Sequence, residues 1–145
     1  MESPEKLDIT DDSDFHHISV EQVLNNYAKI IYLSNVQKGF WADLDEIYES
    51  YALLAEDGVI DSIEKAFRAQ KLALIHSEIS EALEADRADL KDDKLPQYDG
   101  LWVELADGII RILDLCGRYR VDIGTVIKDK LEYNKSRAYK HGKSY

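Results

Sequence analysis

Two stretches of sequence decide the fold: residues 72–83 read LALIHSEISEAL, and residues 101–116 read LWVELADGIIRILDLC. Apolar residues recur in both at intervals of three and four, which is the spacing of one face of an α-helix. The expected apolar faces consist of Leu72, Ile75, Ile79, Ala82 and Leu83 in the first stretch, and Leu101, Leu105, Ile109, Ile112 and Cys116 in the second. We therefore expect two consecutive helices that bury these faces.

Each stretch also carries a pair of acidic residues: Glu78 and Glu81 in the first, Glu104 and Asp107 in the second. Residues three apart lie on the same side of a helix, so each pair presents two carboxylates together. A helical hairpin would bring the two pairs opposite each other. Four adjacent carboxylates repel one another unless cations are present, and hard oxygen ligands suit Mg²⁺ or Mn²⁺.

An ordinary structural explanation competes with this one. Asp107 and Arg111 are four residues apart, as are Asp114 and Arg118, and such pairs are typical of a solvent-exposed helix face. A single acidic pair in a helix carries little information. Two pairs on consecutive helices make a metal site the more specific hypothesis.

Four segments in a fixed order extend the pattern: LIHSEISEALEA at 74–85, ELAD at 104–107, YNKSR at 133–137 and KHGK at 140–143. This ordered set resembles the MazG-like all-α nucleoside triphosphate pyrophosphohydrolases, over most of the chain from Gly39 to Lys143. The resemblance implies that Glu78, Glu81, Glu104 and Asp107 bind Mg²⁺, with Mn²⁺ as a possible substitute, and form the catalytic centre. Many members of that family carry a further Glu where this chain has Ser77.

Candidate substrate contacts lie outside the acidic pairs. The segment of Lys38 and Trp41 is similar to the family segment whose aromatic residues help to form the nucleotide pocket, although an aromatic residue just after a helix also commonly fills a core. Lys130, Asn134 and Arg137 lie on one face of a predicted C-terminal helix. They resemble the family's phosphate-binding pattern, and their alternative role is an exposed polar face.

Composition limits the remaining possibilities. The 145 residues predict one domain, with a flexible acidic arm at 1–17, a helical domain at 18–140 and a basic tail at 141–145. The formal charge of −11 argues against nucleic-acid binding. Cys116 is the only cysteine, which excludes an internal disulfide, and no signal peptide or membrane-length apolar run is found, so we expect a cytoplasmic protein without a membrane partner.

Residues with capping preferences predict the helix ends. Ser19 and Gln22 form a capping box for a first helix that ends at Gly39, and Asp122 can cap the last helix. A short helix at 44–56 is expected to end at Gly58, and a second capping box at Asp61 and Glu64 to start the long helix that carries the first acidic pair.

The expected fold is therefore all-α, a four-helix core bundle of the MazG-like type with an extra short helix. The resemblance implies a homodimer or homotetramer whose helices jointly complete the site. The expected activity is Mg²⁺-dependent cleavage of a (deoxy)nucleoside triphosphate to the monophosphate and pyrophosphate. Two alternatives stay open: a non-catalytic helical scaffold or partner-binding module, and a hydrolase of another phosphoanhydride, such as an alarmone or a phosphoribosyl nucleotide.

Overall fold

The computed structural model describes residues 18–51 and 57–137, and this part of the chain is helical with no strand. Its five helices are α1 (Val20–Gln37), α2 (Ala42–Tyr51), α3 (Asp57–Arg87), α4 (Gly100–Arg118) and α5 (Ile123–Lys135). The predicted all-α class is confirmed. The predicted arm at 1–17 and tail at 141–145 lie outside the described residues.

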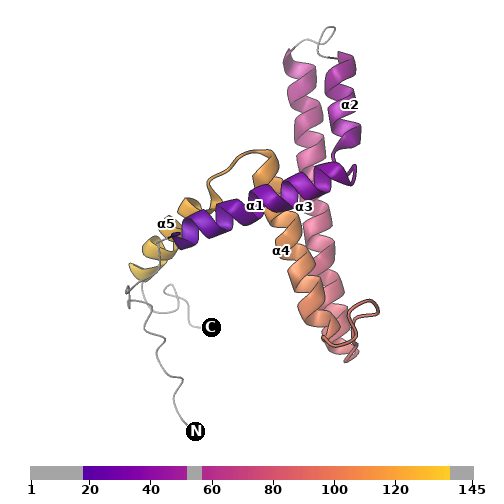
Figure 1. Cartoon of the computed structure of the whole chain (residues 1–145), viewed down its shortest axis with the longest axis vertical. Helices are drawn as coiled ribbons and strands as arrows, with labels where there is room; N and C mark the ends of the chain where they lie inside the picture. Colours follow the sequence, from indigo (N-terminus) through magenta and orange to yellow (C-terminus); the bar gives the residue numbers. More distant parts are fainter. Residues whose placement is uncertain (1–17, 52–56, 138–145) are drawn as a thin grey trace.

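The long helix α3 has two neighbouring helices, α4 and α2 (Figure 1). One half of α3 packs against α4, and the other half runs beside α2. Helix α1 crosses this pair and packs on α4, whereas α5 packs against α1, away from the α3–α4 hairpin. The loop between α3 and α4 is closed by an isolated bridge between Lys91 and Asp99.

Most of the predicted helix ends are confirmed. Both reciprocal hydrogen bonds of the Ser19–Gln22 capping box form, and Asp122 accepts from the backbone of Thr125. Gly39 follows α1 with a φ of 82°, in the left-handed region that glycine adopts without strain.

The predicted boundary between the second and third helices is wrong. Gly58 lies inside α3 rather than ending the short helix, and Asp61 is one turn inside α3, where it pairs with Lys65. Glu64 does not cap α3, because its carboxylate accepts hydrogen bonds from the hydroxyls of Tyr48 and Tyr119. Burial and these bonds raise the pKa of each tyrosine to about 12.

Two glycines allow helices to cross at very short range. At Gly117 of α4, an added Cβ would lie 2.6 Å from Cβ of Tyr32 and would also collide with the backbone of Ala28, both in α1. At Gly124 of α5, it would lie 2.7 Å from the carbonyl carbon of Glu21. Because the obstructing atoms are mostly backbone, the helices could not make room by rotating a side chain.

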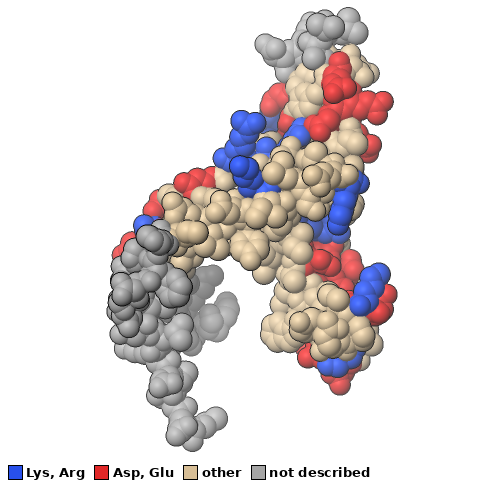
Figure 2. All heavy atoms as spheres, viewed as in Figure 1, with Lys and Arg blue, Asp and Glu red and all other residues tan. Residues whose placement is uncertain are grey.

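The core of the described chain is small. Its buried apolar residues are Ala28, Trp41, Leu44, Ala82, Ala85 and Leu113. The expectation that the apolar faces of the two central helices are buried is wrong for much of their length, since Ile109 is 57 % exposed and Ile79 and Leu83 are also exposed. On the face shown in Figure 2, uncharged residues cover much of the described surface. Within residues 18–51 and 57–137, no helix has the length and apolar character needed to cross a membrane.

Candidate functional site

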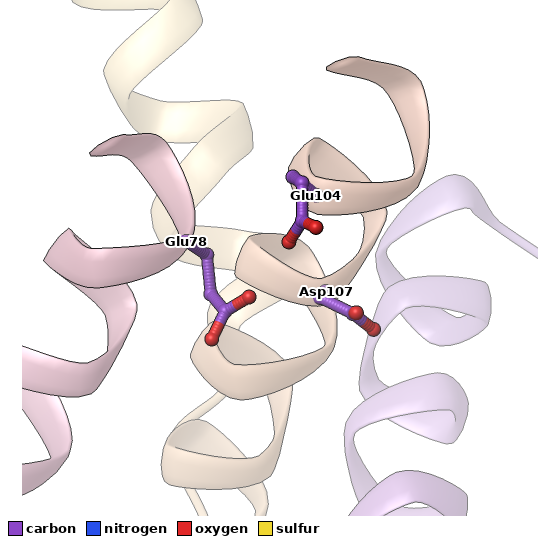
Figure 3. A group of neighbouring side chains, drawn as sticks. All are labelled: Glu78, Glu104 and Asp107. Atoms are coloured by element: carbon purple, nitrogen blue, oxygen red, sulfur yellow. The ribbon is translucent and has the colours of Figure 1, made fainter. Parts of the chain in front are cut away.

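Three of the four predicted metal ligands converge between α3 and α4. Glu78 extends from α3, and Glu104 and Asp107 extend from successive turns of α4 (Figure 3). One carboxylate oxygen from each residue lies within 4.8 Å of the others. The hairpin therefore assembles a set of oxygen donors from two helices, as the spacing of the acidic pairs predicts.

The position of Glu78 is fixed by its neighbours. This side chain is only 5 % exposed, and its Oε1 accepts a hydrogen bond of 2.6 Å from Nε of Arg111 on α4. Gly108 lies at the same level, where a Cβ would lie 3.7 Å from Cβ of Glu78. The small residue and the ion pair together keep α3 and α4 in contact at the cluster.

The ion pairs expected along the exposed face of α4 do not form. Arg111 binds Glu78 rather than Asp107, and Arg118 binds Asp45, with 2.8 Å between Nη2 and Oδ1. Asp114 is 5 % exposed and accepts a hydrogen bond from Trp41. Arg111, Asp114 and Arg118 on the polar face of α4 therefore find partners outside α4.

Burial and neighbouring charges raise the pKa values of two carboxyl groups in the cluster. Burial raises the pKa of Glu104, and the charge of Glu81 and the proximity of Glu78 raise it further. Burial and the charge of Glu78 also raise the pKa of Asp107, against the opposing effect of Arg111. Crowded carboxylates resist ionisation, and a divalent cation would relieve their repulsion.

Glu81, the fourth predicted ligand, lies beside this group rather than within it. It is exposed and borders a shallow pocket with Glu104 and residues of the α3–α4 loop. Its charge still acts on Glu104, as the pKa of that residue shows. Metal binding by Glu81 stays a prediction.

Trp41 occupies the junction of α1, α2 and α4. It is 1 % exposed, and its Nε1 donates to Oδ1 of Asp114 over 3.0 Å. Nζ of Lys71 lies 4.1 Å from the ring centroid, and the guanidinium of Arg118 lies 5.1 Å from it. In this conformation the ring fills the core, so its contact with a substrate stays a prediction.

The predicted substrate contacts near the end of the described chain lie apart from the carboxylates, because α5 packs on α1. Lys130 and Arg137 flank the ring of Tyr133 on α5, with the charges 4.8 and 5.9 Å from its centroid. Oδ1 of Asn134 is buried and has no hydrogen-bond partner among the residues described. Lys38 caps the end of α1 and is exposed. The chain thus groups Lys130, Asn134 and Arg137 together at the end of α5 but does not bring them to the acidic cluster.

A pocket of about 310 Å³ adjoins the cluster, and the sequence did not single out most of its residues. It is lined by Asn35, Phe40, Lys71, Leu74, Asp107, Ile110, Arg111 and Asp114. Lys71 lies seven positions before Glu78, two helical turns away on the same side of α3, and this spacing was the signal that could have identified it.

Comparison with known proteins adds no further information on identity. No family model matches the chain, and it has no significant match among curated proteins or solved structures.

Proposed function

We propose that this chain is a Mg²⁺-dependent, MazG-like nucleotide pyrophosphohydrolase, which cleaves a (deoxy)nucleoside triphosphate to the monophosphate and pyrophosphate. The observation that carries the proposal is the convergence of Glu78, Glu104 and Asp107 from two helices. The ordered sequence motifs support the same reaction.

The donor set fits the ion. Three carboxylates from two rigid helices offer hard oxygen ligands, and an ion such as Mg²⁺ keeps some of its own water in addition. Glu78, Glu104 and Asp107 would hold Mg²⁺, with Glu81 beside them. When bound, Mg²⁺ would neutralise the phosphates and lower the pKa of a water molecule.

The residues of the chain have distinct tasks in this reaction. Arg111 holds the carboxylate of Glu78 in place through its 2.6 Å hydrogen bond. The oxygen of the water bonds to the α-phosphorus, the bond from that phosphorus to the bridging oxygen breaks, and pyrophosphate leaves. A carboxylate of the cluster accepts the proton of the water.

The proposal includes a homo-oligomer in which a second copy supplies the substrate contacts that one chain keeps away from the carboxylates. In one chain, α5 packs against α1, so Lys130, Asn134 and Arg137 are separated from the carboxylates. A second copy packed on the exposed apolar faces could bring its own α5 to the cluster. The exposure of Ile79, Leu83 and Ile109 supports such packing.

The decisive experiment combines a nucleotide panel with labelled water. The purified protein is incubated with nucleoside triphosphates and Mg²⁺ in ¹⁸O water, and we expect the label in the monophosphate and unlabelled pyrophosphate. Glu81→Gln and Asp107→Asn should each abolish turnover while helix content, measured by circular dichroism, stays at the parent level. Labelled inorganic phosphate with a nucleoside diphosphate would contradict the proposed reaction.

A non-catalytic partner-binding module is the second candidate, and the extent of exposed apolar surface favours it. Thermal melting with and without Mg²⁺ separates the two. A ligand that binds the folded state raises the melting temperature by mass action. An unchanged melting temperature together with no turnover on the panel would favour the binding module.

A further inference from the structure

Lys71 is held half-buried in the pocket of about 310 Å³ beside the acidic cluster. Its Nζ donates to the carbonyl oxygen of Phe40 over 2.9 Å and lies 4.1 Å from the ring centroid of Trp41. An ammonium group has three N–H donors, and these two contacts engage only part of them. In the described part of the chain, no carboxylate lies within ion-pair distance of it.

Arg111 supplies a second positive charge to the same pocket. Its Nε is bound to Glu78, and its side chain is 43 % exposed. A planar guanidinium can use its two terminal nitrogens on an anion while Nε keeps a carboxylate partner. The pocket thus places a compact cation and a forked one beside two carboxylates, Asp107 of the acidic cluster and the buried Asp114.

Resting on the proposed function, we propose that this pocket is the subsite for the phosphate chain of the substrate, and that Lys71 and Arg111 bind its oxygens. An anionic group here would lie next to Asp107, so it could contact these cations and an ion held by the carboxylates together. Desolvation lowers the pKa of Lys71, and an anion would compensate for the lost hydration. The subsite lies within one chain and is separate from Lys130, Asn134 and Arg137.

Trp41 provides a probe that does not depend on turnover. Trp102 is exposed on α4, so Trp102→Phe leaves Trp41, beside Lys71, as the only tryptophan. This protein is titrated with inorganic pyrophosphate at fixed Mg²⁺, and we expect a saturable change in Trp41 emission. Adding Lys71→Met should weaken the apparent affinity by about tenfold or more, because an ion-assisted hydrogen bond is lost. Lys71→Arg should restore part of it.

Lys65→Met is the matched control, because Lys65 is on the same helix, is exposed and pairs with Asp61. It should bind pyrophosphate as the parent does. The subsite would be overturned if Lys71→Met left the affinity for pyrophosphate unchanged. It would also be overturned if a nucleoside without phosphate changed the Trp41 emission as much as pyrophosphate does. If the parent cleaves triphosphates and Lys71→Met leaves the Michaelis constant unchanged, only this inference fails. If the parent binds pyrophosphate through Lys71 but cleaves no nucleotide, the proposed function fails and the subsite stands.

Discussion

At the scale of single residues, the acidic cluster brings three carboxylates close together, and we expect their repulsion to lower the stability of the fold. Glu104 and Asp107 lie one turn apart on α4, and Glu78 faces them from α3. The pKa values of Glu104 and Asp107 are raised. A carboxyl group whose pKa is raised on folding contributes its stabilisation below the unfolded value, and that contribution is lost as the pH rises through the folded value.

Glu104→Gln should therefore stabilise the metal-free protein at pH 7. We expect a gain of about 0.2–0.5 kcal/mol, the cost of a like-charge pair one turn apart, and the gain should shrink as the pH falls toward the usual carboxyl range. If the cluster binds Mg²⁺ as proposed, Mg²⁺ should stabilise the parent more than the variant. Urea denaturation in the presence of a chelator, at pH 7 and at a pH within the usual carboxyl range, measures the effect.

Glu84→Gln on the exposed surface of α3 is the control, since Glu84 lies outside the acidic cluster and pairs with Arg87 at 3.8 Å. It should change stability little at either pH. A metal-free Glu104→Gln protein less stable than the parent at pH 7 would show that the cluster is not repulsive.

Trp41 allows the structural and substrate-binding roles to be separated. Trp41→Ala should lower the free energy of unfolding by about 3–5 kcal/mol, because it empties a fully buried position. Trp41→Phe keeps an aromatic ring but leaves the buried carboxylate of Asp114 without its donor, at a cost of about 1–3 kcal/mol.

The exposed Trp102 supplies the comparison, and Trp102→Phe should change the free energy of unfolding by less than about 0.5 kcal/mol. Unchanged stability of the Trp41→Ala protein, with a raised Michaelis constant for nucleotide, would instead identify Trp41 as a surface for base stacking.

At the scale of elements, the arrangement of helices depends on the two glycine crossings. Gly117 lets α4 approach α1 at Ala28 and Tyr32, and Gly124 lets α5 approach the same helix at Glu21. An ordinary side chain at either position requires the helix backbones to separate.

Gly117→Ala should destabilise the fold by about 1–3 kcal/mol, the usual range for an overpacked contact. Gly58→Ala is the matched control, because Gly58 is also helical but an added Cβ would meet no atom of the described residues within 4 Å. The control should be neutral or stabilising by up to about 1 kcal/mol. Thermal and urea denaturation of both variants test this, and equal effects would show that the crossing is not close-packed.

Sequence reasoning succeeded for local structure and for the relation between the acidic pairs. Capping residues identified the start of α1 and α5, and residue spacing placed three carboxylates together. It failed where a residue's partner is distant in the chain. The spacing of Asp114 and Arg118 is typical of an exposed ion pair, whereas Asp114 is buried against Trp41, which is 73 positions away. Periodicity identifies the faces of a helix but not the helix that each face meets.

At the scale of the whole molecule, the described chain buries little apolar surface and exposes much of it. Large exposed apolar side chains occur on all five helices, among them Ile30, Ile109 and Leu131. Extensive exposed apolar surface is typical of a surface that another protein covers.

We therefore expect the protein to form a homo-oligomer in solution, and Ile109→Glu to weaken it. Placing a charge on a covered apolar face costs several kcal/mol, so the variant should shift toward monomer. Light scattering coupled to size-exclusion chromatography measures the mass. Lys65→Glu, on the polar surface of α3, should leave the parent mass unchanged, and a monomeric parent would contradict the prediction.

The packing of α5 on α1 has a consequence for the order of folding. The α3–α4 hairpin joins segments close in sequence, whereas the bonds of Asn25 with Asp122 and Gly124 span 97 and 99 residues. Long-range contacts form late because the intervening chain must first be closed into a loop. We expect the amides of α5 to exchange with deuterium well before those of α3 and α4, as α5 detaches while the hairpin persists. Simultaneous exchange of all helices would show that the chain opens as one cooperative unit.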